Sequence, residues 1–185
     1  NLKLKLIGDF QFKNLSMAVQ SALLCNLSFK KIEKSLYKIQ SVEGRLSEIK
    51  TFQNGTKVFI DFAHTPEALE KVLCSIKSNF SRKISVVFGC GGQRDSKKRP
   101  LMGKIASKYC EKIYITDDNP RYENAKKIRK EIIEGIRNSN YFNIGSRSNA
   151  IKTAVVNSEP GEIILVAGKG HETFQDYGKM KKKIS

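Results

Sequence analysis

From residue 57 onward, short apolar runs alternate with longer segments in which apolar residues recur at helical spacing. Residues 84–88, 113–116 and 163–167 are apolar at nearly every position, which is typical of strands buried within a parallel sheet. Between them we expect a helix starting at Thr65-Pro66, then helices over 100–109, 125–137 and 148–156. The alternation predicts an α/β domain with a Rossmann-like, mostly parallel sheet flanked by helices.

The residues before this alternation have a different pattern. Helical spacing predicts one helix over 14–26 and a second after Ser28, which can act as its cap. Apolar residues over 46–52 and 57–62, with Asn54-Gly55 between them, predict an antiparallel β-hairpin. We therefore expect two parts: residues 1–45 as the helical tail of a separate domain, and residues 46–185 as the α/β domain that opens with the hairpin.

The net charge of +16 allows two interpretations. The chain has 34 Lys and Arg residues against 18 Asp and Glu, an excess typical of proteins that bind nucleic acid. A basic nucleic-acid-binding α/β module is therefore one hypothesis. The sequence favours the other, a lysine-rich solvated surface, because the lysines are scattered and no aromatic stripe lies among them.

Several other classes of protein do not fit the sequence. None of the four cysteines forms a CxxC pair and only two histidines occur, so we expect reduced thiols and no metal site. No apolar run is long enough to span a bilayer, and residues 1–4 alternate where a signal peptide would be apolar. The chain does not begin with Met, so we expect that it starts inside a longer cytoplasmic protein.

Four polar or glycine-rich loops follow the expected strands. In parallel sheets, ligands bind at the carboxyl ends of the strands, so these loops are the places to look for function. The loops span residues 61–65, 89–95, 117–121 and 168–172.

Most features of these loops allow two interpretations. The glycine loops match neither a complete dinucleotide fingerprint nor a P-loop, so each is either a tight turn or part of a site. His64 lies beside a helix N-terminus that can attract phosphate, but it also suits a simple loop hydrogen bond. Asp61 is suited either to bind a ribose hydroxyl or to cap its own turn. Asp117 and Asp118 are either a metal pair or helix-capping acids, and we favour capping.

Arg94, Arg121 and Glu172 form a more specific combination if their loops meet. A guanidinium pairs with a carboxylate through two hydrogen bonds, and a carboxylate beside it can receive an ammonium group. This set would suit an amino-acid zwitterion. A surface salt-bridge cluster is the alternative, and spacing alone does not separate the two.

Taken together, these motifs resemble the carboxy-terminal domain of the Mur ligases. The resemblance runs in order over nearly the whole chain, and residues 7–45 resemble the end of the family's central ATPase domain. The motifs that carry it are Asp61-Phe62-Ala63-His64-Thr65-Pro66, Val87-Phe88-Gly89-Cys90-Gly91-Gly92, Lys98-Arg99-Pro100-Leu101-Met102-Gly103, Asp117-Asp118-Asn119-Pro120-Arg121 and Val166-Ala167-Gly168-Lys169-Gly170-His171-Glu172.

The resemblance implies an ATP-dependent ligase that forms an amide bond. ATP phosphorylates a carboxylate of UDP-MurNAc-dipeptide, and the amine of meso-diaminopimelate attacks the acyl phosphate. The positions that resemble ATP contacts are Asn14, Arg45, Asp61 and His64. The positions that resemble the diaminopimelate site are Arg94, Asp118, Asn119, Pro120, Arg121, Gly168 and Glu172. The Asp-Asn-Pro-Arg sequence at 118–121 marks the family members that add diaminopimelate, and members that add lysine differ there.

The resemblance also implies what this chain lacks. The family's P-loop, Mg²⁺ ligands and carbamylated lysine belong to upstream domains, so we expect no catalytic residue here and no activity without those domains. Nucleic acid and membrane are not expected partners. Gln11 replaces a common Asn, which puts one nucleotide contact in doubt, and Gln93 replaces a common acidic residue before Arg94. Another Mur or folylpolyglutamate-type ligase is the alternative within the superfamily.

Overall fold

The computed structural model describes residues 6–137 and 140–184, so the expected alternation over residues 1–4 lies outside it. It divides into two compact units, one ending at Val42 and the other beginning at Glu43. The first unit contains α1 (Asp9–Leu24) and α2 (Phe29–Leu36), which confirms both expected helices. Ser28 is the N-cap residue of α2, but its side chain makes no capping hydrogen bond.

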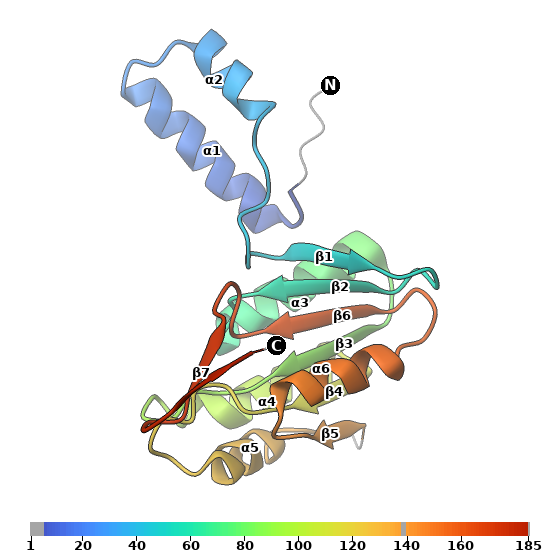
Figure 1. Cartoon of the computed structure of the whole chain (residues 1–185). Coiled ribbons are helices and arrows are strands. Elements are labelled where there is room, and N and C mark those ends of the chain that lie inside the picture. The colour runs from blue at the N-terminus through green and yellow to red at the C-terminus, as the bar shows by residue number, and fades with distance from the viewer. Residues whose placement is uncertain (1–5, 138–139, 185) are drawn as a thin grey trace. The chain divides into compact units, whose positions relative to one another are not determined.

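The second unit is built on a six-stranded sheet with the strand order β1-β2-β6-β3-β4-β5 (Figure 1). The strand β1 pairs antiparallel with β2, and all the other neighbours are parallel. Its strands are β1 (Ser47–Thr51), β2 (Lys57–Asp61), β3 (Ile84–Phe88), β4 (Lys112–Ile115), β5 (Tyr141–Asn143) and β6 (Ile163–Ala167). The expected hairpin and the mostly parallel Rossmann-like sheet are confirmed.

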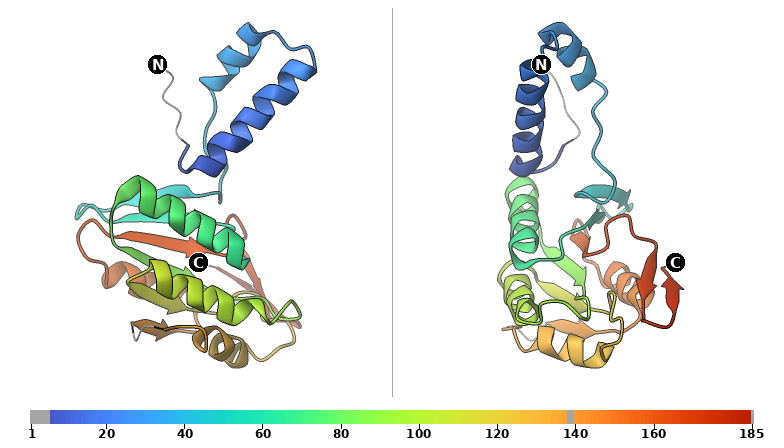
Figure 2. Two further views of the ribbon diagram at one scale, coloured as in Figure 1. Left: turned by 180° about the vertical axis from the view of Figure 1, so that it is seen from behind. Right: turned by 90° about the vertical axis from the view of Figure 1, so that its left-hand side faces the viewer.

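Helices cover both faces of this sheet, which is why β3 and β6 are buried at every position. One face carries α3 (Pro66–Phe80), α4 (Lys98–Tyr109) and α5 (Ala125–Ile133), and the other carries α6 (Arg147–Val156) (Figure 2). The start of α3 is as expected: the Thr65 hydroxyl accepts a hydrogen bond from the amide of Ala68 at 3.2 Å, and Pro66 is the first helical residue. None of the described helices has the length and apolar character needed to cross a bilayer.

Three strands were not expected from the sequence. They are β5 at the sheet edge and an antiparallel pair at the end of the chain, β7 (Phe174–Asp176) and β8 (Lys181–Lys183). Residues 163–167 form the last fully buried strand among the described residues, because β7 is only partly buried and β8 is exposed. β8 consists of three lysines, so it lacks the apolar signal on which strand prediction depends.

The helix α5 ends at Ile133, four residues earlier than expected, and the chain continues in turns at Gly135 and Ile136 that lie close to α4. A methyl group at Gly135 would overlap the carbonyl oxygen of Pro100, and one at Gly103 would overlap that of Ile132. The backbone of α4 therefore meets that of α5 at Gly103 and that of the following turn at Gly135, and only glycine fits at either position.

We predict that Gly103→Ala destabilises the second unit. The added methyl group must displace the α5 backbone, and overpacking of this kind costs about 1–3 kcal/mol. Chemical denaturation should show the corresponding loss in the free energy of unfolding. Lys104→Ala, at the exposed next position of α4, is the control and should change it by about 0.5 kcal/mol or less. Equal stability of the two variants would contradict the proposed close contact.

Candidate functional site

The loops that follow β2, β3, β4 and β6 surround a pocket of about 220 Å³. The parallel strands all end at this edge of the sheet, as the sequence predicted for a ligand site. The lining residues are Phe62, His64, Gly89, Cys90, Gly91, Arg94, Lys98, Asp118, Asn119, Arg121, Gly168 and Glu172. The structure thus brings together Arg94, Arg121 and Glu172, whose meeting the sequence left open.

Two glycines allow the loop after β3 to lie directly against the loop after β4. A methyl group at Gly89 would overlap the carbonyl oxygen of Thr116, and one at Gly92 would overlap that of Pro120. The Gly92 amide donates to the carbonyl of Asn119 at 2.8 Å. Pro120 itself is buried, and its carbonyl lies against Gly92 rather than in the lining of the pocket.

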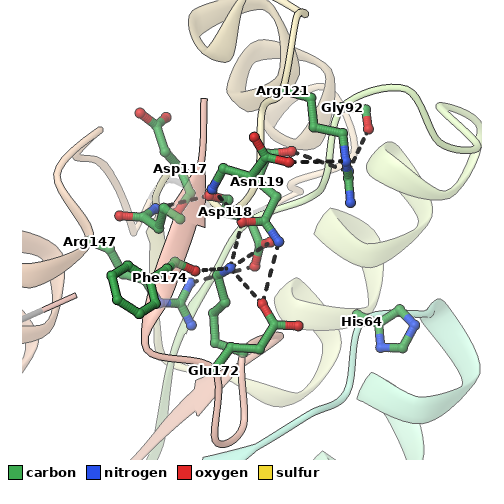
Figure 3. Close-up of polar contacts among 12 residues, drawn as sticks. His64, Gly92, Asp117, Asp118, Asn119, Arg121, Arg147, Glu172 and Phe174 are labelled. Carbon is green, nitrogen blue, oxygen red and sulfur yellow. Dashed lines mark hydrogen bonds and ion pairs between the residues drawn. The ribbon is translucent and has the colours of Figure 1, made fainter. Parts of the chain in front are cut away.

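Arg121 is held in the pocket wall by contacts on both sides. Its Nη1 donates to the Gly92 carbonyl at 2.7 Å, and its Nε lies 3.8 Å from Oδ2 of Asp176 in β7. Its backbone is left-handed, with φ of 52°, and its amide donates to the Asp176 carbonyl at 2.9 Å. Figure 3 shows the guanidinium directed toward Gly92. Arg94 is exposed on the same pocket, in the loop after β3.

A buried lysine that sequence reasoning did not select lies behind the pocket. Lys169 is 4% exposed, and its ammonium donates to Oδ1 of Asn119 at 2.6 Å, Oε2 of Glu172 at 2.7 Å and the carbonyl of Phe174 at 2.7 Å. Asn119 also donates to Oε2 of Glu172 at 3.4 Å, and Figure 3 shows these two side chains facing each other. Burial by itself raises the pKa of Glu172, but the hydrogen bond and charge of Lys169 outweigh burial and lower it below 4.5.

Asp118 lies between two buried cations. Its carboxylate oxygens are 3.9 Å from Nη1 of Arg147 and 3.9 Å from Nζ of Lys169. Burial raises the pKa of Asp118, and the charges of Arg147 and Lys169 oppose that rise. Arg147, the first residue of α6, also donates to the Ala167 carbonyl at 2.8 Å, and burial lowers its pKa. The carboxylate of Asp118 therefore faces two cations before any ligand binds.

Another buried arginine supports the glycine loop from behind. Arg99 is 1% exposed, and it donates to the carbonyl of Gly91 at 3.2 Å. Its guanidinium is held by Glu123 at 2.9 Å and Glu131 at 2.6 Å. Arg99 and Arg147 lie on segments expected to be helical or helix-flanking, where an arginine ordinarily faces solvent. Sequence reasoning had no signal that would mark either as buried.

Asp117 points away from the pocket and forms an ion pair with Arg129. The Tyr177 hydroxyl also donates to its Oδ2 at 3.1 Å, and burial together with Asp117 raises the pKa of Tyr177 to about 12. Asp117 and Asp118 thus have separate partners. Within residues 6–137 and 140–184, no group of three or more His, Cys, Asp or Glu side chains is placed to hold a metal ion.

The residues that resemble ATP contacts lie in different surroundings. Exposed His64 precedes α3 and lines the pocket, and the Arg45 guanidinium lies 5.0 Å from the centroid of the Phe62 ring. Both oxygens of Asp61 accept backbone hydrogen bonds at 2.7 Å, from Leu46 and from Ala63, so this carboxylate closes its own turn. Asn14 is exposed on α1, in the first unit.

Cys90 lines the pocket but is not suited to act as a nucleophile. Burial raises the pKa of its thiol to about 12, and the Sγ–H is directed to Sδ of Met102 at 3.6 Å. The thiol is therefore part of the apolar wall, together with the ring of Phe62.

Comparisons with known proteins agree on one family. The profile described as Mur ligase, glutamate ligase domain, matches residues 44–170. The chain is 46% identical to a UDP-N-acetylmuramoyl-L-alanyl-D-glutamate–2,6-diaminopimelate ligase of Rickettsia bellii over 95% of the chain, and 40% identical to the enzyme of that name from Brucella melitensis over 97%. It spans only 37% and 36% of those relatives.

Solved structures with similar folds include a ligase of the same name. A structure bearing the same ligase name superposes with a TM-score of 0.74 at 32% identity, covering 100% of this chain and 38% of that one. A folylpolyglutamate synthase from Thermotoga maritima superposes with a TM-score of 0.68 at 23% identity, covering 91% of this chain and 38% of that one, which shows a shared fold alone.

We predict that Lys169→Met raises the pKa of Glu172. The wild-type pKa is depressed, so the pair stabilises the folded state above about pH 4.5, and this stabilisation is lost as the pH falls through the lowered pKa. Carboxyl-carbon NMR titration of the chain measures the shift directly. Glu48, whose pKa is lowered by Lys57 in the β1–β2 hairpin, is the internal control and should keep its value. An unchanged Glu172 pKa would contradict the ion pair.

Proposed function

Since this chain belongs to the Mur ligase family, we propose that it is the carboxy-terminal part of an ATP-dependent ligase that adds meso-diaminopimelate to UDP-MurNAc-L-Ala-D-Glu in peptidoglycan synthesis. The observation that carries the proposal is the pocket in which Arg94, Arg121 and Glu172 come together. The chain spans about 37% of its relatives, so a P-loop and Mg²⁺ ligands are proposed for the rest of the protein.

The pocket has the groups that a diamino diacid requires. The guanidinium groups of Arg94 and Arg121 suit carboxylates, because each can donate two parallel hydrogen bonds. The carboxylate of Glu172 suits an ammonium group. We assign Arg121 to the distal carboxylate of diaminopimelate, which lysine lacks. Lysine has no group to pair with the remaining donors of this guanidinium, so the hydrogen bonds that a second carboxylate would accept are lost.

The part played by this chain is to hold the attacking amine. Fixing an amine beside its electrophile can supply much of the rate of such a reaction. ATP, when bound, supplies the phosphoryl group that activates the carboxylate of the nucleotide-linked dipeptide. We propose that His64 is an ATP contact of the carboxy-terminal domain, and that Asn14 and Arg45 are ATP contacts of residues 1–45, the tail of the central ATP-binding domain. Asp61 contributes by shaping the loop that presents His64.

We predict that the full-length enzyme incorporates meso-diaminopimelate in preference to lysine. Radiolabelled amino acid, ATP and the UDP-linked dipeptide provide a direct assay, in which kcat/KM for the two amino acids is compared. Omission of ATP is the control and should abolish product. Equal use of lysine would refute the substrate assignment, and a lack of any ATP-dependent product would refute the ligase activity.

Arg121→Ala should raise KM for diaminopimelate about tenfold to a hundredfold, as expected for the loss of a charged hydrogen-bonding partner, while KM for ATP stays within about twofold. Steady-state kinetics of the full-length enzyme measure both. Arg82→Ala is the matched control, because exposed Arg82 also donates to a backbone carbonyl, that of Gly55 at 3.2 Å. A parallel rise in both KM values would show that Arg121 does not contact the amino acid.

A further inference from the structure

Lys169 differs from the surface lysines of this basic chain because its ammonium is buried and fully used. All three hydrogen-bond donors of the group have partners, and these lie on three segments: Asn119 after β4, Glu172 after β6 and Phe174 in β7. An ammonium removed from water is costly unless such partners compensate it. The burial of Lys169 is therefore tied to the arrangement of the loops that form the pocket.

The first effect of Lys169 is on Asn119. Oδ1 of Asn119 accepts from Nζ of Lys169 at 2.6 Å and from the amide of Asp176 at 2.8 Å. Because both neighbours are donors, the amide can adopt only one orientation, with Nδ2 on the side of Glu172. Lys169 and the Asp176 amide together thus direct Nδ2 of Asn119 toward Glu172.

The second effect is on Glu172, a flexible side chain on an otherwise exposed loop. Its Oε2 accepts hydrogen bonds from both Lys169 and Asn119, and its side chain remains 38% exposed. Holding it in one orientation before the ligand arrives removes the cost of ordering this side chain from the binding step. Lys169 thereby links two of the residues proposed to bind the amino acid into a single rigid pair.

The third effect is electrostatic. The charged side chains that line the pocket among the described residues are Arg94, Lys98, Arg121, Asp118 and Glu172. Lys169 adds a buried positive charge beside Glu172, so the environment of the pocket is biased against a ligand that is itself a cation. Diaminopimelate is neutral overall at pH 7, whereas lysine carries a net positive charge.

We propose that Lys169 is a positioning and specificity-determining residue of the amino-acid site. Its buried ammonium fixes Asn119 and Glu172 as one unit and disfavours a cationic amino acid relative to a zwitterionic diacid. The inference rests on the proposed function. It adds a residue that acts through Asn119 and Glu172 rather than by touching the substrate.

The test uses the full-length enzyme carrying Lys169→Met. We expect KM for diaminopimelate to rise about tenfold, the loss typical of one charged hydrogen bond, while KM for ATP stays within about twofold. We also expect the ratio of kcat/KM for lysine to that for diaminopimelate to rise. Lys112→Met is the matched control: Lys112 is also a largely buried lysine paired with a carboxylate, Glu162 at 3.0 Å, but it lies at the other end of β4. Lys112→Met should alter the stability of the protein without altering KM for diaminopimelate or the ratio of kcat/KM for lysine to that for diaminopimelate.

A double-mutant cycle with Glu172→Gln separates positioning from general destabilisation. If Lys169 acts through Glu172, the two substitutions together raise KM by less than the product of their separate effects. Multiplicative effects, or an unchanged preference against lysine, would overturn the inference.

If circular dichroism shows that Lys169→Met does not fold, Lys169→Gln provides the same measurements with the charge removed. A wild-type enzyme that does not use diaminopimelate refutes the proposed function, whereas normal Lys169 variants in an active enzyme refute this inference alone.

Discussion

The site depends on the parallel pairing of β6 between β2 and β3. The strand that comes late in the sequence, Ile163–Ala167, lies in the middle of the sheet and pairs with both neighbours. Its loop therefore emerges between the loops that carry His64 and Gly89, which lie far away along the chain. This insertion places Glu172 and Lys169 beside the loop after β4, where Glu172 adds a second carboxylate to the pocket that Asp118 also lines.

The frame of the pocket could be predicted from sequence because it depends on local signals. Buried strands, the cap at Thr65 and the turn at Asn54-Gly55 each have a short-range pattern, and all three appear in the structure. The order in which strands pair fixes which loops meet, and sequence periodicity says nothing of that order. The meeting of Arg94 with Glu172 was therefore a hypothesis until the topology was known.

The features that the sequence did not predict are mostly charged side chains that are buried. Lys169, Arg147 and Arg99 are each 4% exposed or less, although lysine and arginine are ordinarily surface residues. Their burial depends on partners that are distant in sequence: Arg99 on Glu123 and Glu131, Lys169 on Asn119. The strands β7 and β8 have a related cause: hydrogen bonds to the Asn119–Arg121 loop hold β7 in place, and β8 pairs with β7, so neither depends on apolar residues of its own.

The backbone contacts at Gly89 and Gly92 have a consequence for how such a pocket can diversify. The distance between the two loops is set by main-chain atoms and by the absence of side chains, and the side chains of Arg94 and of 118–121 extend from loops held at that spacing. The dimensions of the pocket and its chemistry are thus determined by different residues. Exchanging one of these side chains would change which ligand fits the pocket, while the spacing of the two loops is preserved.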